Sequence, residues 1–356
     1  MTNQTKLTKQ QAGIASILVT MILMIVISLV TIGFAKLVRR EQRQSLDTQL
    51  STQAFYAAET GINDAIDAIK NQNYQNEKTD CGPESSGPLS GTSNILDAAK
   101  SVEYSCLLID PSPTSLDYDN ISTDKSTVIP IIPQSGSINK ITLSWQDTTG
   151  GTNVNCTYTP GQFPPANSWP ADCDAGMLRI DLVPLGSGLT RSNLVGNTLT
   201  AFLQPYNSGS VGTVTFVTPT NQGDIVGTKC DTGNTPKLCS VTIQGPLGAA
   251  LGQNFYLRVR SIYKPNSLNV IATDNGNDQL ELTGVQAVID STGKASDVLR
   301  RIVAKIPLNN LSDGDVPEFA IMSGESICKR MSVTPNIAPD VSNPTNDPAC
   351  NLDFLN

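Results

Sequence analysis

The chain has 356 residues and a formal net charge of −8, a balance that argues against nucleic acid as a partner of the whole protein. It contains no histidine, so imidazole is excluded as a general base, metal ligand or proton shuttle. Its 27 glycines and 22 prolines favour short strands joined by turns over a helical bundle.

The first feature along the chain is an uncharged apolar run, residues 14–35, dominated by Ile, Leu, Val and Met. Such a run is long enough to cross a hydrocarbon layer of about 30 Å as a helix. A removable signal peptide has a shorter apolar core, of about 7 to 15 residues, and then small residues at a cleavage site. Here Lys36 and Arg39 follow instead. We therefore predict a retained transmembrane helix over residues 14–36.

The helix is predicted to continue beyond the membrane. No proline occurs before Pro83, and apolar residues recur at steps of three and four, which is typical of one apolar helix face: Leu46, Leu50, Ala54, Ala57, Ala58, Ile62, Ala65, Ile66 and Ile69. Gly61 lowers helix propensity by about 1 kcal/mol in the last turns. Residues 37–72 are therefore expected to form an amphipathic continuation of the same rod.

All eight cysteines lie beyond the apolar run, in four sequential couples: Cys81 with Cys106, Cys156 with Cys173, Cys230 with Cys239, and Cys328 with Cys350. None has a C-x-x-C spacing, so a zinc site is disfavoured and disulfides are favoured. Neighbour pairing is the simplest of about 105 arrangements. Disulfides place this region in an oxidising, extracytoplasmic space.

The basic residues around the span indicate the opposite orientation, with the cysteine-containing region in the cytoplasm. More of them follow the span than precede it, and the positive-inside rule would leave the C-terminal side in the cytoplasm: Lys6 and Lys9 come before it, and Lys36, Arg39, Arg40 and Arg43 come after it. We give more weight to the cysteines, because four reduced couples would have no structural purpose in the cytoplasm.

Beyond the helix, turn residues dominate at first. Residues 73–137 are expected to be a loop-rich segment with one strand at 104–109. From 138 to 310 an antiparallel β domain is predicted, because short runs with period-two character alternate with turn residues: 138–145, 177–183, 199–204, 212–217 and 240–243. The tail, 311–356, is expected to be loop-rich and held by its own cysteine couple.

The best-patterned stretch is residues 254–306, which we expect to form one meander. Asn275-Gly276 predicts a primed hairpin turn within it. Such a sheet would bury one face on the amphipathic half of the first helix. The predicted fold class is therefore α+β: a long N-terminal helix, membrane-spanning and then amphipathic, packed on an antiparallel sheet region with disulfide-stapled loops.

Two acidic clusters, residues 274–278 ("DNGND") and 312–315 ("SDGD"), could supply oxygen ligands to calcium. Neither matches the twelve-residue calcium loop, and turn chemistry explains both. A carboxylate-pair hydrolase is conceivable, but nothing in the spacing marks two carboxylates as a pair. We therefore predict no catalytic, metal or cofactor site.

The leader "KQQAG", which ends in Gly13, the apolar helix and then "QAFYAAETGINDAI" (53–66) together resemble the N-terminal region of PilX-type minor pilins of type IV pili and of the related large pseudopilins of type II secretion. The family's Ala-Ala-Glu pattern falls on Ala57, Ala58 and Glu59. Residues 285–306 are similar to the terminal hairpin of such pilins, in which Ser-Thr-Gly forms the turn and Arg-Arg opens the last strand.

The resemblance implies that residues 1–13 are a prepilin leader. An aspartyl prepilin peptidase would cut after Gly13 on the cytoplasmic side and N-methylate Ile14, which also settles the orientation. The implied partners are other pilin subunits, contacted through the N-terminal helix, the prepilin peptidase and a membrane assembly platform. The implied location is the cytoplasmic membrane, in a single pass with an extracytoplasmic C-terminal region, and then a pilus or the cell surface.

The chain departs from the family at one position. Major pilins carry a glutamate five residues after the cleaved glycine, and here that position is Leu18. We therefore predict a low-copy minor pilin or pseudopilin at or near the filament tip, which helps to start assembly and presents a surface for an unknown ligand. The alternative is a membrane-anchored extracytoplasmic binding protein that does not polymerise. Neighbouring genes for a prepilin peptidase, an assembly ATPase and a platform protein would distinguish the two.

Overall fold

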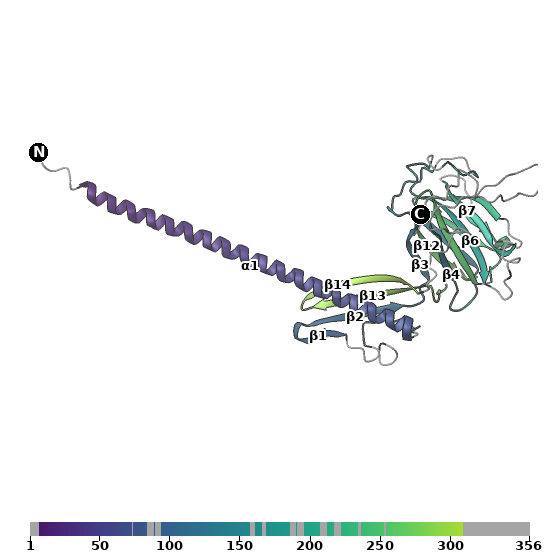
Figure 1. Ribbon diagram of the computed structural model, residues 1–356, viewed down its shortest axis with the longest axis horizontal. Coiled ribbons are helices and arrows are strands. Elements are labelled where there is room, and N and C mark those ends of the chain that lie inside the picture. The colour runs from purple at the N-terminus through teal and green to yellow at the C-terminus, as the bar shows by residue number, and fades with distance from the viewer. Residues whose placement is uncertain are drawn as a thin grey trace, which may run out of the picture.

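The computed structural model describes most of the chain: residues 7–72, 74–83, 89, 94–156, 161–165, 169–185, 190, 196–206, 212–216, 222–233, 236–252 and 254–308, with the side chains of the first helix described from Ser16. That helix, α1 (Leu7–Gln72), has 66 residues and is about 100 Å long at about 1.5 Å per residue. It is continuous through Gly61, as predicted, and its first half projects away from the rest of the protein (Figure 1).

A four-stranded antiparallel sheet packs on the second half of α1 (Figure 1). Its strand order is β1-β2-β13-β14, and a 3₁₀ turn, η1, joins the first two strands. The bounds are β1 (Ile95–Asp97), η1 (Ala98–Lys100), β2 (Val102–Asp110), β13 (Gln286–Ala295) and β14 (Val298–Pro307). We refer to this sheet as the helix-docked sheet.

The second body is a sandwich of two five-stranded sheets. One has the order β3-β12-β5-β10-β8 and the other β4-β11-β6-β7-β9. The bounds are β3 (Ser115–Ile121), β4 (Thr127–Ile131), β5 (Lys140–Asp147), β6 (Met177–Leu185), β7 (Leu199–Tyr206), β8 (Thr213–Thr215), β9 (Gln222–Lys229), β10 (Cys239–Gln244), η3 (Pro246–Gly248), β11 (Asn254–Ile262) and β12 (Asn266–Thr273).

The sandwich has its own core, because alternate side chains of both sheets point inward. β11 shows the alternation most clearly, with Phe255, Leu257 and Val259 fully buried. They belong to one cluster with Trp145 and Leu143 of the facing sheet. The predicted α+β class is therefore confirmed, although the β8–β10 and β7–β9 pairs are parallel rather than antiparallel.

The sandwich is inserted into the helix-docked sheet. The chain leaves that sheet after β2 and returns to it at β13, so that residues 111–285 form the insertion. Asp117 of β3 joins the two bodies: its backbone N–H donates to Oε1 of Gln286 and its carbonyl accepts from Nε2 of the same side chain, at 3.2 and 2.8 Å. Its carboxylate pairs with Lys305 of β14.

Several predicted elements are present, and others are corrected. Runs 138–145, 177–183, 199–204 and 240–243 correspond to β5, β6, β7 and β10, whereas 212–217 contains only the short β8. The described residues of the segment 73–137 form four strands instead of one. The meander expected over 254–306 is divided among three sheets, because β11 and β12 face each other across the sandwich and only β13 and β14 reach the helix.

Two turn predictions are wrong. Positive φ occurs at Asn277 rather than at Asn275-Gly276, because the Asp274 carboxylate accepts the backbone N–H groups of Gly276 and Asp278 and shapes a wider loop. Ser-Thr-Gly does not form the last turn, since residues 291–293 lie inside β13. The chain reverses at 295–298 instead.

Candidate assembly helix and its docked half

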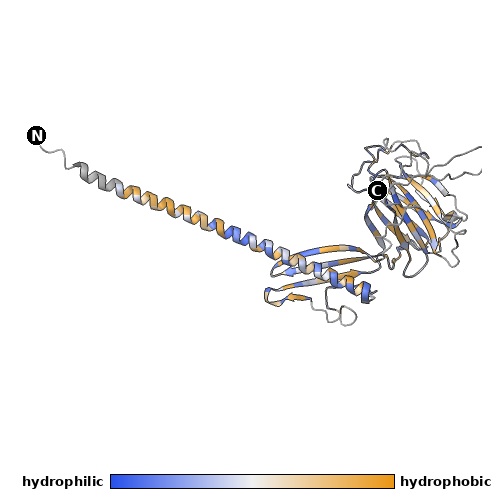
Figure 2. Cartoon of the chain, viewed as in Figure 1, coloured by the Kyte–Doolittle hydropathy of each residue, from blue (hydrophilic) through white to orange (hydrophobic). Residues whose placement is uncertain are grey.

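The N-terminal half of α1 is an uncovered apolar rod. Large apolar side chains from Ile17 to Phe34 are exposed on all sides, with Met24 72% and Leu29 64% exposed (Figure 2). By length and composition this helix can cross a membrane. A helix that is apolar all round is stable only in lipid or among other apolar helices. This half of α1 is therefore a surface that needs a partner.

The predicted processing and pairing positions all fall on α1. Gly13 and Ile14 lie in its first turns, since the helix begins at Leu7. Leu18 is 57% exposed and lies among apolar neighbours. No acidic residue occurs from Ile14 to Ala35. Within the span, the chain therefore offers no carboxylate to a neighbouring subunit.

A basic stripe follows the apolar rod. Its four residues are exposed, and their spacing of three and four places them on one side of α1: Lys36, Arg39, Arg40 and Arg43. Figure 2 shows the change from apolar to hydrophilic residues at this level of the helix. The stripe lies where the candidate membrane span ends.

The second half of α1 docks on the sheet through small side chains. Ala54, Ala57, Ala58 and Ala65 are fully buried. Across from them, a Cβ on Gly293 of β13 would lie 1.9 Å from the carbonyl oxygen of Ala54, so only glycine allows this approach of helix and strand. The glycine of the Ser-Thr-Gly sequence is therefore a contact point rather than a turn residue.

A second close contact lies two turns further along the helix. A Cβ on Gly61 would lie 2.5 Å from Oγ of Ser291 and 3.1 Å from the ring of Tyr104. The hydroxyl of Tyr104 donates to Oδ2 of Asp64 at 3.1 Å. Burial, together with the neighbouring Asp64 carboxylate, raises the pKa of Tyr104 to about 12. Gly61 therefore allows both β13 and β2 to approach the helix, at the cost in helix propensity noted above.

The family pattern at Ala57, Ala58 and Glu59 has a structural basis. The two alanines face the sheet, whereas Glu59 is exposed. Just before them, Phe55 and Tyr56 point away from the sheet, 48% and 60% exposed, with their rings edge to face at 6.0 Å. The pattern therefore combines a close-packed inner face with an aromatic outer face.

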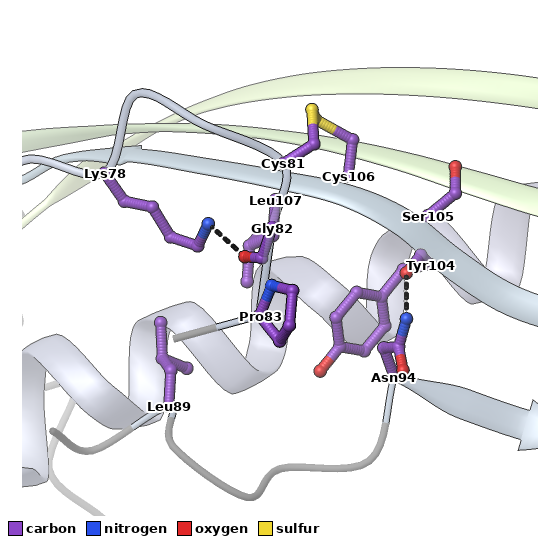
Figure 3. A pocket seen from close by; sticks show the side chains of 10 residues that line it. All are labelled: Lys78, Cys81, Gly82, Pro83, Leu89, Asn94, Tyr104, Ser105, Cys106 and Leu107. Atoms are coloured by element: carbon purple, nitrogen blue, oxygen red, sulfur yellow. Dashed lines mark hydrogen bonds between the residues drawn. A yellow bond between two sulfur atoms is a disulfide. The ribbon is translucent and has the colours of Figure 1, made fainter. Parts of the chain in front are cut away.

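Three of the four expected disulfides are present: Cys81–Cys106, Cys156–Cys173 and Cys230–Cys239. Cys328 and Cys350 lie outside the described residues, as does the "SDGD" cluster. The first disulfide ties the chain that leaves α1 to β2. A hollow of about 270 Å³ lies beside it, in which Nζ of Lys78 donates to the carbonyl of Gly82 at 2.8 Å (Figure 3).

In the acidic cluster that the structure describes, the carboxylate of Asp274 serves the backbone instead. In the "DNGND" loop, the Asp274 carboxylate accepts N–H groups at 2.8 and 2.9 Å, as turn chemistry predicts. Among the residues with described side chains, no group of three or more Cys, Asp or Glu is arranged to hold a metal ion.

These features define the class as an α+β protein with one candidate membrane span, whose helix continues into a docked half. A family model described as PilX N-terminal matches residues 12–63, so this part of the chain is similar to the N-terminal region of that family. This is a family of structural pilins rather than of enzymes. No curated protein and no solved structure matches the chain.

Sequence reasoning missed two parts of this arrangement. The roles of Gly293 and Gly61 depend on which strand faces which helical turn, although a glycine inside a strand pattern is a recognised signal of close backbone approach. The insertion between β2 and β13 gave no signal, because a strand pattern does not show which sheet the strand joins.

Proposed function

We propose that the protein is a minor pilin or pseudopilin, a structural subunit of a type IV pilus-like filament. The observation that carries the proposal is the uncovered apolar half of α1, joined without a break to a half that is docked on its own sheet. In the membrane, lipid would cover the first half, and in a filament the helices of neighbouring subunits would cover it. The match to the PilX N-terminal family supports this proposal.

Processing and orientation are part of the proposal. A prepilin peptidase cuts between Gly13 and Ile14 in the cytoplasm and methylates the new amine, and a membrane platform then takes up the subunit. The docked sheet and the sandwich lie outside the cytoplasm. The three disulfides support this side, because such bonds persist in oxidising compartments.

The subunit occupies the tip of the filament or lies near it. Its amine at Ile14 can pair with the acid of a neighbour, but Leu18 provides no acid in return. An unpaired charge in an apolar core costs several kcal/mol, so repeating this subunit along a shaft would repeat that cost. At the tip, a neighbour is absent on one side, and the cost does not recur.

The inserted sandwich supports the same position. It lies at the far end of the molecule from the span (Figure 1), and its bulk would crowd a helically packed shaft. At the tip it would present a surface for adhesion and leave the shaft undisturbed. A role in starting assembly is consistent with the tip position, because the first subunit extracted from the membrane becomes the end of the filament.

Immunogold labelling of sheared filaments with antibody against the sandwich tests this proposal. Label at filament ends, or in the cell envelope, is the expected result. Continuous label along the shaft would contradict the tip position. If neither filaments nor the envelope-bound assembly complex contained the protein, the alternative of a membrane-anchored binding protein that does not polymerise would be favoured.

A further inference from the structure

The basic stripe of α1 has no partner within the part of the chain that the structure describes. Its four side chains are exposed and line one hollow on the surface of the helix, together with Gln44 and Asp47. None of the four forms an ion pair or a hydrogen bond with a described residue. Asp47 is the only acid that lines the hollow, so positive charge is in excess there. The stripe is therefore suited to an anionic group from outside the chain.

The stripe lies in a gap between the apolar rod and the docked half of α1. Residues 36–49 are exposed, and Leu50 is the first residue after them that packs against the sheet. Residues 14–35 extend about 33 Å at about 1.5 Å per residue, which slightly exceeds a hydrocarbon layer of about 30 Å. In a bilayer, the stripe would therefore lie at the level of the polar headgroups and just outside it.

The position of this charge is not explained by the topology of the protein. Basic residues are normally enriched on the cytoplasmic side of a span, yet in the proposed orientation the four stripe residues lie on the other side. Lipid phosphates are the anions at that level. Three of the four residues are arginines, whose guanidinium groups present paired N–H donors that match the oxygens of a phosphate.

We propose that the basic stripe binds the phosphate groups of anionic phospholipids in the extracytoplasmic leaflet. Clusters of about four to eight Lys and Arg beside a span attract such lipids, and the attraction falls off within a Debye length of about 10 Å at 0.1 M salt. The contact holds the span at one depth in the bilayer. This inference rests on the proposed function for the span and its orientation, and not for filament assembly.

Lipid titration of the purified full chain in neutral detergent micelles, followed by native mass spectrometry, tests this proposal. The probes are phosphatidylglycerol, which is anionic, and phosphatidylcholine, whose phosphate is neutralised by its own choline. The unmodified protein should bind phosphatidylglycerol at least about tenfold more tightly, and less so at high salt. The preference should disappear in the stripe variant, which combines Lys36→Gln, Arg39→Gln, Arg40→Gln and Arg43→Gln.

The stripe variant should unfold at the same temperature as the unmodified protein, because the four side chains make no ion pair or hydrogen bond with a described residue. The matched control removes four positive charges outside α1 and should keep the lipid preference: Lys100→Gln, Lys125→Gln, Lys140→Gln and Lys229→Gln. Equal binding of the two lipids would overturn the proposal, and so would the same preference in both quadruple variants.

Two further outcomes would assign the stripe to another anion and overturn the proposal. Glycerol phosphate carries the headgroup without acyl chains, and displacement of the lipid by an equal concentration of it would indicate a site for free phosphate. A second copy of the chain that binds in place of lipid, and is lost only in the stripe variant, would indicate an acidic neighbouring subunit.

Alkaline extraction of membranes separates failure of the lipid site from failure of the proposed function. A chain that stays in alkaline-washed membranes but shows no lipid preference would overturn the lipid site and leave the span as proposed. A chain that alkali releases would overturn both, because the stripe would then not lie at the level of the headgroups.

Discussion

The two halves of α1 belong to one unbroken helix but make opposite use of their side chains. In the first half, large residues such as Met24 and Leu29 are exposed in every direction. In the second half, alanines and Gly61 are buried against β2 and β13 so closely that backbone nearly meets backbone. One half therefore supplies contact area to something outside the chain, and the other fixes the helix to its own sheet.

This difference predicts which positions of α1 tolerate a larger side chain. A helix covered by lipid or by neighbouring helices can accept a new methyl group, because its surroundings adjust. A helix held at backbone contact by a folded sheet cannot, because cores are packed at crystal-like density. Glycines in the two halves should therefore respond very differently to the same substitution.

The largest effect is expected at Gly293. Gly293→Ala places a methyl group 1.9 Å from the Ala54 carbonyl oxygen, so helix and strand must separate. We expect a loss of about 3 kcal/mol or more in the free energy of unfolding, measured by thermal unfolding of the full chain in detergent. Gly33→Ala is the control, since nothing lies within 4 Å of its Cβ and stability should be kept or slightly raised. Equal losses would contradict the comparison of the two halves.

The second effect comes from the disulfide between the end of α1 and β2. Replacing Cys81 and Cys106 by serine should cost about 2 to 3 kcal/mol, because the bond closes a loop with a sequence separation of 25. The Cys230–Cys239 bond spans only 9 residues, and its loss should cost roughly 1 kcal/mol less. A larger loss from the shorter loop would show that local strain, and not chain entropy, dominates.

A third effect is the pH dependence that Tyr104 gives to the docked half. The folded state raises the pKa of Tyr104 to about 12, so between pH 10 and pH 12 the unfolded chain loses this proton first. Stability should therefore fall as pH rises through this window. Tyr104→Phe should cost about 1 kcal/mol at neutral pH and make the alkaline loss shallower. An unchanged alkaline slope would show that Tyr104 does not cause it.

The smallest effect on stability is expected at the outer face of the docked half. Tyr56 is 60% exposed, so Tyr56→Ala should change the free energy of unfolding by no more than about 0.5 kcal/mol. If this face contacts a neighbouring subunit, recovery of the variant in sheared filaments should fall while its amount in the membrane stays constant. Unchanged recovery would remove Tyr56 from the assembly surface.

The helix could be predicted from the sequence almost completely. Its apolar run, the absence of proline before Pro83 and the recurrence of small and apolar residues are local signals, and local signals fix a helix. The partners of the three described disulfides could be predicted as well, because each of these couples closes a short loop. Both features depend on residues that are near one another in the chain.

For the sheets, the sequence predicts individual strands but not how these strands pair. Period-two patterns identified β5, β6 and β11, but a strand pattern does not reveal its partner, so the split of 254–306 among three sheets was missed. The turn at Asn275-Gly276 failed because the side chain of Asp274 competes for the backbone N–H groups of its own loop. The contact at Gly293 needed the register between strand and helix, which only the fold supplies.

The mass of the mature N-terminus is the most direct test of the proposal that α1 is the assembly helix of a processed pilin subunit. Protein taken from membranes of its native cell should be digested and its N-terminal peptide sequenced by mass spectrometry. We expect a chain that begins at Ile14 with one methyl group on its amine, and no peptide from residues 1–13. A mature chain that still begins at Met1 or Thr2 would contradict it.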